Sequence, residues 1–259
     1  QVKIATRVGT GPFSELALRN VMASGVDTSC VQHDEGLQTG SILILITPDA
    51  QRTMLSSAGA TRHLDAAFLN PDDITSCDAL VMSAYSLIGG LQREYAVKAL
   101  DIAKRAGLTT FIDMGSGAVN ALQDRLISLT QDFDYLLMNQ KELLTLTGAT
   151  SISEAVNGLA HEGIKRVIVK VGEKGSLVIT PEVTELIEAY EIDGVVDSTG
   201  AGDYYTAAFA HGIMEGYDLR EAARLGNIAG ALNTVQVGAQ KSDLSVEILE
   251  HYAKELTTA

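Results

Sequence analysis

Several features that are common in membrane, secreted and nucleic-acid-binding proteins are scarce in this sequence. Its 259 residues include no tryptophan, 2 cysteines and 4 prolines. Cys30 and Cys77 are isolated and form no C-x-x-C pair, which excludes a disulfide framework and favours a reducing, cytoplasmic compartment. The longest apolar run, from Ile42 to Ile46, has the length of a strand, whereas a membrane-spanning helix needs about 18 apolar residues.

Basic residues are also scarce relative to acidic ones. The chain has 19 Lys and Arg against 33 Asp and Glu, which gives a formal net charge of −14. Because an acidic surface repels nucleic acids and anionic membranes, neither is expected as a partner. With 46% hydrophobic and 20% charged residues, the chain is typical of a globular protein. We therefore expect a small-molecule substrate, and an anionic one would have to be attracted by local dipoles or a metal ion.

The order of predicted elements is that of an α/β protein. Strands are expected over 2–8, 79–83, 109–113, 135–139 and 166–171, with helices over 12–24, 91–106, 119–129, 153–161, 219–235 and 244–255 and a short one ending at 147. This alternation predicts a three-layer α/β/α sandwich with a mostly parallel central sheet. Hairpins are expected at 39–55, through Pro48–Gln51, and at 176–187. We expect a single domain over 1–259, with 37–56 as part of a small β lid.

The most distinctive motif is the strand-to-helix turn over residues 197–203, which reads DSTGAGD. The first N–H groups of a helix are unpaired and bind anions, and Gly200 and Gly202 let a phosphate approach them closely. Asp203 lies in the first helical turn, where its carboxylate can reach a hydroxyl beside that phosphate. An anion site next to a base is what phosphoryl transfer to an alcohol requires. From the residues alone, the alternative is a tight turn with Asp203 as a helix cap.

Three further stretches are candidates for a ligand site. Asn139 and Glu142 lie where a strand ends and a helix begins, so they form a capping box, a ligand site at the sheet edge, or both. The glycines at 172 and 175 have the pattern of a hairpin turn, and Lys170 before them either faces a phosphate or points to solvent. Asn227 lies in a helix rich in small residues, which close helix–sheet packing explains most simply.

A dinucleotide-binding fingerprint is only half present near the N-terminus. Gly9 and Gly11 follow a strand, but Ser14 stands at the third glycine position and no acidic residue ends a second strand about 20 residues later. An ordinary strand-to-helix turn explains these glycines better. No G-x-x-x-x-G-K-[ST], H-E-x-x-H or G-x-S-x-G motif occurs, so a P-loop, a zinc protease and a serine hydrolase have no support.

The motif at 197–203, with small residues behind it, closely resembles the C-terminal signature of the PfkB (ribokinase-like) carbohydrate and nucleoside kinases. Asn139-x-x-Glu142 resembles the N-x-x-E motif of the same family. Residues 51–54 and Tyr204-Tyr205 are similar to those of adenosine-kinase-like members. The resemblance implies a ribokinase-like fold, ATP and Mg²⁺ as cofactors, and a sugar or nucleoside as acceptor.

The resemblance also implies a role for each motif residue. Asp203 would orient and deprotonate the acceptor hydroxyl, while the amides of Gly200, Ala201 and Gly202 would hold the transferred phosphoryl group. Glu142 would act on Mg²⁺ through water. The other implied nucleotide contacts are Asn139, Gly172, Gly175, Thr199 and Asn227. Lys170 is predicted as a further contact, although many relatives carry Thr at its position. Asp197 and Thr199 correspond to a family site for a monovalent cation, K⁺, bound through backbone oxygens.

The sequence departs from the family pattern in several places. Relatives begin with an additional strand carrying an Asp and with a Gly-Gly helix start, so we expect a preceding segment to complete the acceptor site. Asp113 ends a strand without the Pro, Asn and Arg that often follow it, and it is not predicted as a site residue.

A nucleotide-binding regulatory protein without kinase activity is the alternative function. A dinucleotide oxidoreductase is supported only by Gly9-x-Gly11. The chain is expected as a monomer or as a homodimer through the lid.

Overall fold

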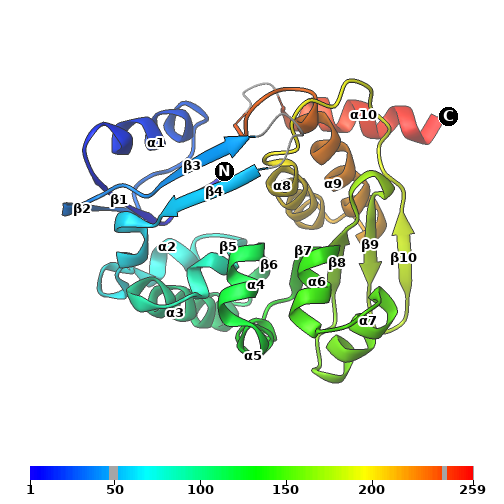
Figure 1. The fold of residues 1–259 in the computed structure, drawn as a ribbon, viewed down its shortest axis with the longest axis horizontal. Helices are drawn as coiled ribbons and strands as arrows, with labels where there is room; N and C mark the ends of the chain where they lie inside the picture. Colours follow the sequence, from blue (N-terminus) through cyan, green and yellow to red (C-terminus); the bar gives the residue numbers. More distant parts are fainter. Residues whose placement is uncertain (47–51, 241–243, 259) are drawn as a thin grey trace. The chain divides into compact units, whose positions relative to one another are not determined.

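The computed structural model describes residues 1–46, 52–240 and 244–258 (Figure 1). The chain forms two compact units. The first comprises Gln1–Cys77 and Ser86–Ala106, and the second comprises Asp78–Tyr85 and Gly107–Ala259. The expectation of a single domain with a lid at 37–56 remains a prediction.

The first unit contains two separate two-stranded sheets. Strands β1 and β2 pair in parallel, and β3 and β4 form an antiparallel hairpin. The elements of this unit are β1 (Thr6–Thr10), α1 (Pro12–Ala23), β2 (Val31–Gln38), β3 (Ser41–Ile46), β4 (Arg52–Ser57), α2 (Pro71–Thr75) and α3 (Gly90–Ala106). The hairpin prediction is thus confirmed, although its turn at 48–51 lies outside the described residues. Strand β2 was not predicted, because its sequence VQHDEGLQ is largely polar and carries little of the alternation typical of a strand.

The second unit contains a six-stranded sheet of order β10-β9-β8-β7-β6-β5, in which β5 to β8 are parallel and β9 and β10 antiparallel. Its strands are β5 (Ala79–Ser83), β6 (Thr109–Asp113), β7 (Tyr135–Asn139), β8 (Val167–Lys170), β9 (Ser176–Ile179) and β10 (Thr184–Ile187). Its helices are α4 (Ser116–Leu122), α5 (Asp124–Thr130), α6 (Gln140–Thr147), α7 (Ile152–His161), α8 (Ala201–Met214), α9 (Leu219–Thr234) and α10 (Val246–Thr258). The mostly parallel sheet is therefore confirmed.

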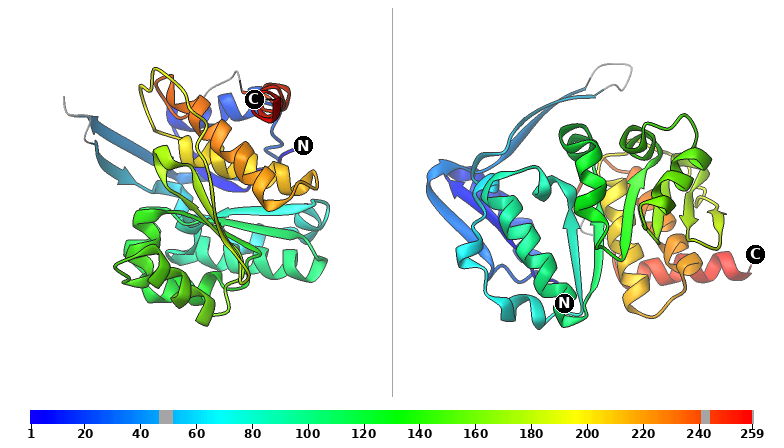
Figure 2. Two further views of the ribbon diagram at one scale, coloured as in Figure 1. Left: turned by 90° about the vertical axis from the view of Figure 1, so that its right-hand side faces the viewer. Right: turned by 90° about the horizontal axis from the view of Figure 1, so that it is seen from below.

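The parallel strands are buried on both faces, which explains their continuous apolar sequences. On one face, Phe111 stacks on Tyr135 with 4.9 Å between ring centroids, and Phe209 from α8 meets both rings edge-on. Side chains alternate along a strand, so the neighbouring residues Ile112 and Leu136 point to the opposite face, where they are fully buried. Helices α8 and α9 lie side by side on the first face, and α6 contacts β7 and β8 (Figure 2). Helices on both faces give the three-layer arrangement predicted from the sequence.

Two local predictions were wrong in detail, and a third was incomplete. The helix expected over 119–129 is divided into α4 and α5 at Gln123, a non-glycine residue with a φ of 47° that no helix can continue through. The first strand lies at Thr6–Thr10, later than the expected 2–8. The small residues of α9 serve the predicted helix–sheet packing only in part. Ala222 and Ala223 pack with sheet residues, but α9 also packs closely against α8, because a Cβ atom on Gly226 would lie 2.8 Å from the Tyr205 ring of α8.

Both cysteines are free thiols, as predicted. Within the described ranges, no helix combines the length and the apolar character that crossing a bilayer would need.

Candidate active site

A cavity of about 1180 Å³ lies at the carboxyl ends of the parallel strands of the second unit. Asp113, Asn139 and Lys170 are the last residues of β6, β7 and β8, and all three line it. The N-terminus of α8, with Gly202 and Asp203, forms another part of its wall. Ligands of open α/β sheets bind at this edge, so the topology itself brings the predicted motifs together.

The tip of α8 has several amide groups without an acceptor in the described part of the chain. Gly200 is the N-cap with a φ of 86°, a left-handed conformation suited to glycine. The amide of Ala201 donates to the Ser198 carbonyl oxygen at 3.3 Å. Among the described residues, no group accepts a hydrogen bond from the amides of Gly200, Gly202 or Asp203. The tip therefore offers donors to an anion, with the Ala201 amide already partly engaged.

Asp203 combines access to the cavity with a raised pKa. Its side chain is exposed, yet the protein around it removes part of its hydration, and this loss raises the pKa of the carboxyl group. The negative charge of Asp113 raises the pKa further, whereas the Lys170 ammonium lowers it. A carboxylate with a raised pKa accepts a proton more readily, which suits a general base.

Lys170 does not point to open solvent, because its side chain is 15% exposed and paired with Asp113. The other sequence alternative, that it faces a phosphate, stays a prediction. Its Nζ atom donates to Asp113 Oδ2 at 2.8 Å and Oδ1 at 3.0 Å, and it also lies 3.4 Å from Thr206 Oγ1 and 3.5 Å from the Gly202 carbonyl oxygen. The Thr206 hydroxyl donates to Asp113 Oδ2 at 2.5 Å. Asp113 and Thr206 are thus cavity residues that the sequence did not identify. Only the position of Asp113 at a strand end pointed to it.

Asn139 and Glu142 form a complete capping box at the start of α6. Asn139 Oδ1 accepts from the Glu142 amide at 2.9 Å, and Glu142 Oε2 accepts from the Asn139 amide at 2.9 Å. The other carboxylate oxygen of Glu142 accepts from the Ser116 hydroxyl at 2.9 Å. Each carboxylate oxygen has two lone pairs, so this buried group at the cavity wall can still accept a bond from a metal-bound water. The stabilising and the ligand-binding interpretations are therefore compatible.

The glycines of the turn after β8 have different roles. Gly175 has a φ of 100°, its amide donates to the Gly172 carbonyl oxygen, and a Cβ there would lie 2.1 Å from the Ile187 carbonyl oxygen. Close approach of two backbone segments therefore requires glycine at 175. Gly172 has a φ of 65° with no atom within 4 Å of a Cβ position, and it lines the cavity. Only Gly172 leaves open space for a ligand.

Asn227 lines the cavity but uses its side chain largely for structure. Its Nδ2 atom donates to the carbonyl oxygens of Ile187 at 3.0 Å and Glu188 at 2.9 Å. Both amide hydrogens are thereby engaged at the end of β10, so only Oδ1 is left for a nucleotide.

The loop before α8 is held by Asp197. Its Oδ1 accepts from the Thr199 amide and its Oδ2 from the Gly238 amide, both at 2.9 Å. The carbonyl oxygen of Thr199 accepts from Asn233 Nδ2 at 2.8 Å. Asn233 is 1% exposed, and its Oδ1 is buried without a hydrogen-bond partner. A buried oxygen without a donor beside a backbone carbonyl fits a cation there.

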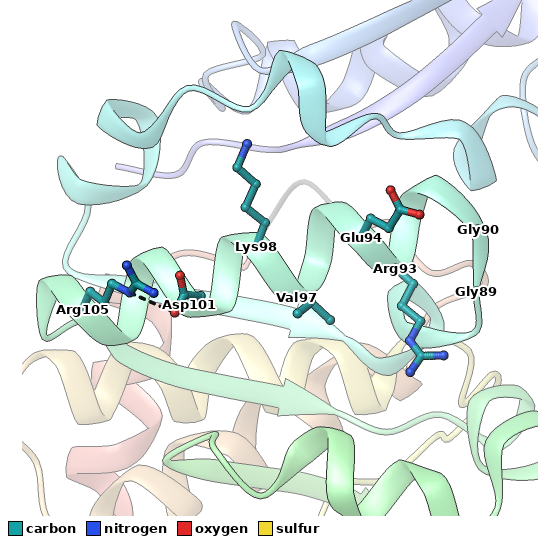
Figure 3. Close-up of a pocket in the computed structure, with 8 residues that line it drawn as sticks. All are labelled: Gly89, Gly90, Arg93, Glu94, Val97, Lys98, Asp101 and Arg105. Carbon is teal, nitrogen blue, oxygen red and sulfur yellow. Dashed lines mark hydrogen bonds and ion pairs between the residues drawn. The ribbon is translucent and has the colours of Figure 1, made fainter.

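A second hollow, of about 780 Å³, lies along α3 in the first unit (Figure 3). Arg105 Nε donates to Asp101 Oδ1 at 3.0 Å, and Lys98 Nζ donates to the Ala66 carbonyl oxygen. Alternating charges on one exposed helix face are typical of a solvated surface. In the part of the chain that the structure describes, no cluster of three or more His, Cys, Asp or Glu side chains can hold a metal ion. The cavity at α8 is thus the better candidate site.

Comparison with known proteins identifies relatives across nearly the whole chain. A family model described as "pfkB family carbohydrate kinase" matches residues 1–246. A deoxyribokinase from Salmonella typhi is 25% identical over 259 residues, which cover 97% of this chain and 81% of the relative. The crystal structure of adenosine kinase from Sinorhizobium meliloti has a TM-score of 0.87 at 25% identity and covers 98% of this chain and 77% of that one. A fructokinase from Vibrio cholerae with fructose, ADP and calcium bound shares the fold, with a TM-score of 0.86 at 22% identity over 97% and 85% of the two chains.

Proposed function

Because the chain belongs to the pfkB family of carbohydrate kinases, phosphotransferases that act on a hydroxyl group, we propose that it transfers the γ-phosphate of ATP to a hydroxyl of a sugar or nucleoside. The observation that carries this proposal is the tip of α8. There, the Gly202 and Asp203 amides, which have no acceptor among the residues that the structure describes, lie on the wall of one cavity together with the Asp203 carboxylate of raised pKa. Such a tip stabilises the charge that develops on a transferred phosphoryl group.

In this proposal, Asp203 is the general base that orients and deprotonates the acceptor hydroxyl. The amides of Gly200 and Gly202 hold the phosphoryl oxygens. Ala201 contributes less than the sequence suggested, since its amide already donates to Ser198. The loose transition state of phosphoryl transfer needs positioning and charge stabilisation more than covalent participation by the protein.

The residues around the tip would hold the nucleotide. Glu142 would accept hydrogen bonds from waters on Mg²⁺, which keeps most of its waters in proteins and needs few carboxylates. The bound metal would neutralise charge on the phosphates. Asn139 would contact a phosphate through its amide nitrogen, since its oxygen caps α6. Lys170 and Gly172 would lie along the phosphates, and Asn227 would face the nucleotide through Oδ1. Gly175 would contribute by shaping the turn, and Thr199, which does not line the cavity, by holding the loop before α8.

ADP release measured over a panel of sugars and nucleosides, with Mg–ATP and the full-length protein, tests this function. Acceptor-dependent ADP release is expected for at least one sugar or nucleoside. ATP binding without release of ADP on any acceptor would instead favour the alternative, a nucleotide-binding regulatory protein of the same fold.

We also propose that a monovalent cation such as K⁺ binds beside Asp197 and Thr199. The carboxylate of Asp197 already accepts two amide hydrogen bonds, so backbone oxygens would supply most ligands. The buried, unpartnered Oδ1 of Asn233 supports a positive charge at this place. Because this loop leads directly into the tip of α8, the cation would stabilise the anion-binding turn.

Replacing Asn233 by leucine, which has a similar volume and no amide, should raise the K⁺ concentration for half-maximal activity by about 10-fold. The measurement is a K⁺ titration of ADP release at constant ionic strength with tetramethylammonium as the replacement ion. Asn157→Leu, on the exposed surface of α7, is the matched control and should leave the titration unchanged. Wild-type activity that is independent of K⁺ would contradict the cation site.

The hairpin of β3 and β4 favours the homodimer among the two expected oligomeric states. Its directly paired residues Leu43 and Leu55 are 59% and 56% exposed, and the next pair, Ile44 and Met54, is exposed on the opposite face. A two-stranded sheet that is apolar on both faces is marginal in water. Pairing with the same surface of a second copy would bury these side chains, as in other two-fold interfaces.

A variant with both Leu43→Lys and Leu55→Lys should therefore be monomeric in light scattering at concentrations where the wild type is a dimer. The matched control, Ser41→Lys with Ser57→Lys, places the same like-charge pair at the base of the same face, where no apolar contact is lost. If both variants behave alike, or if the wild type is itself a monomer, the dimer is refuted.

A further inference from the structure

Lys170 is the one basic side chain among the described residues that line the cavity at α8. The same wall carries six carboxylates, namely Asp113, Glu142, Glu173, Glu191, Asp193 and Asp203. Holding a polyphosphate against so many negative groups requires positive charge. The position of this one ammonium group is therefore decisive for how the site works.

Asp113 anchors Lys170 without using all of its hydrogen-bonding capacity. An ammonium has three donors, and the two short bonds, at 2.8 and 3.0 Å, both go to the Asp113 carboxylate. The remaining contacts, at 3.4 Å to Thr206 Oγ1 and 3.5 Å to the Gly202 carbonyl oxygen, are long. The ammonium group can therefore give up one of these long contacts and donate to a phosphoryl oxygen while it keeps both hydrogen bonds to Asp113.

The anchor places the ammonium beside the helix tip. A Cβ atom on Gly202 would lie 3.4 Å from Lys170 Nζ. The ammonium group of Lys170 and the backbone of Gly202 at the tip of α8 are therefore direct neighbours. Thr206 follows Asp203 by three residues, and residues at this spacing share one face of a helix. The Thr206 hydroxyl, which donates to Asp113, therefore connects β6 to the same face of α8.

The charged groups that shift the pKa of Asp203 come from the sheet and not from its own helix. Asp113 on β6 raises its pKa and Lys170 on β8 lowers it, after the larger effect of lost hydration. The other charged groups on the cavity wall are Glu142 of α6, Glu173 of the turn after β8, and Glu191 and Asp193 of the loop after β10. The tyrosines on this wall are Tyr85, Tyr190 and Tyr205.

We propose that Asp113 is a positioning residue that holds the Lys170 ammonium at the tip of α8, where the pair sets the electric field at Asp203 and supplies positive charge for the transferred phosphoryl group. This inference rests on the proposed kinase function and extends it, since it assigns roles to two side chains that belong to different strands. Asp113 contributes by holding Lys170 and by its own charge near Asp203, and not by contact with a substrate.

Two charge-removing variants test the proposal because they should act in opposite directions. Asp113→Asn keeps a side chain of the same shape but removes a negative charge, so the pKa of Asp203 should fall. Lys170→Met removes the positive charge, so the pKa of Asp203 should rise. Each shift is expected to be about 1 pH unit. Lys170→Arg keeps the charge and should restore the wild-type value.

The titration of Asp203 is measured by carboxyl carbon NMR of the full-length protein and assigned by its loss in Asp203→Asn. The acid limb of kcat/KM is measured in parallel. Asp101→Asn with Arg105→Met, which removes an exposed ion pair on α3, is the matched control and should leave both profiles unchanged. Denaturant unfolding verifies that each variant is folded, and if Asp113→Asn does not fold, the comparison of Lys170→Met with Lys170→Arg decides alone.

If the pKa of Asp203 shifts in opposite directions in the two variants, the proposal is supported. If, in addition, no acceptor is ever phosphorylated, only the kinase function is refuted. Shifts in the same direction, or none in folded variants, overturn the proposal even if wild-type turnover is high. Lys170→Met should also raise the KM for ATP more than Lys170→Arg does, which a purely structural ion pair would not predict.

Discussion

Replacing Asp203 by alanine should lower the rate of phosphoryl transfer by about 10²–10⁴-fold, the usual contribution of a general base. The variant should bind Mg–ATP as well as the wild type or slightly more tightly, because it loses a negative charge next to the phosphate site. The measurements are ADP release with a saturating acceptor and ATP affinity by calorimetry. A lower turnover with unchanged ATP affinity indicates that only the general base is lost, whereas a lower ATP affinity indicates that the nucleotide site is damaged.

Glu215→Ala provides the matched control for this experiment. Glu215 is an exposed carboxylate at the other end of α8. Glu215→Ala therefore removes one negative charge, as Asp203→Ala does, but far from the tip of the helix. It should retain full turnover. Turnover of Asp203→Ala equal to that of this control would remove Asp203 from the mechanism.

Replacing Gly202 by alanine should reduce transfer by about 10²–10³-fold, comparable to the loss of one oxyanion donor. The new methyl group would lie 3.4 Å from Lys170 Nζ, and we expect it to keep phosphoryl oxygens away from the tip amides. The substitution should not damage the fold. Gly202 lies within α8, where alanine stabilises a helix by up to about 1 kcal/mol relative to glycine.

A helical glycine elsewhere gives the control for Gly202→Ala. Gly158 of α7 has no atom within 4 Å of a Cβ position and does not line the cavity. Gly158→Ala should therefore stabilise the protein to a similar degree, as measured by denaturant unfolding, with unchanged turnover. If Gly202→Ala retains full activity at normal stability, phosphoryl oxygens do not approach the tip amides at this point.

Local sequence features predicted most of the elements of the second unit. Strands β5, β6 and β7 lie at the predicted residues, because short apolar runs between turn residues have few other ways to be buried. The capping box at Asn139 and Glu142 was also readable, since its two hydrogen bonds connect residues three apart. The division between α4 and α5 could not be predicted, because Gln123 adopts a left-handed conformation. A glycine at this position would have indicated such a conformation, but a glutamine does not.

The sequence by itself determined the α/β order of elements and the glycine-containing turn that presents backbone amides at the start of α8, because both depend on neighbouring residues and on backbone groups present at every helix start. Only the tertiary structure decided the environment of Asp203. Lys170 and Thr206 are 57 and 93 residues away from Asp113 along the chain. The three side chains nevertheless meet where β6, β8 and α8 converge. Contacts between residues so distant along the chain follow from strand order and helix packing, and no local pattern encodes them.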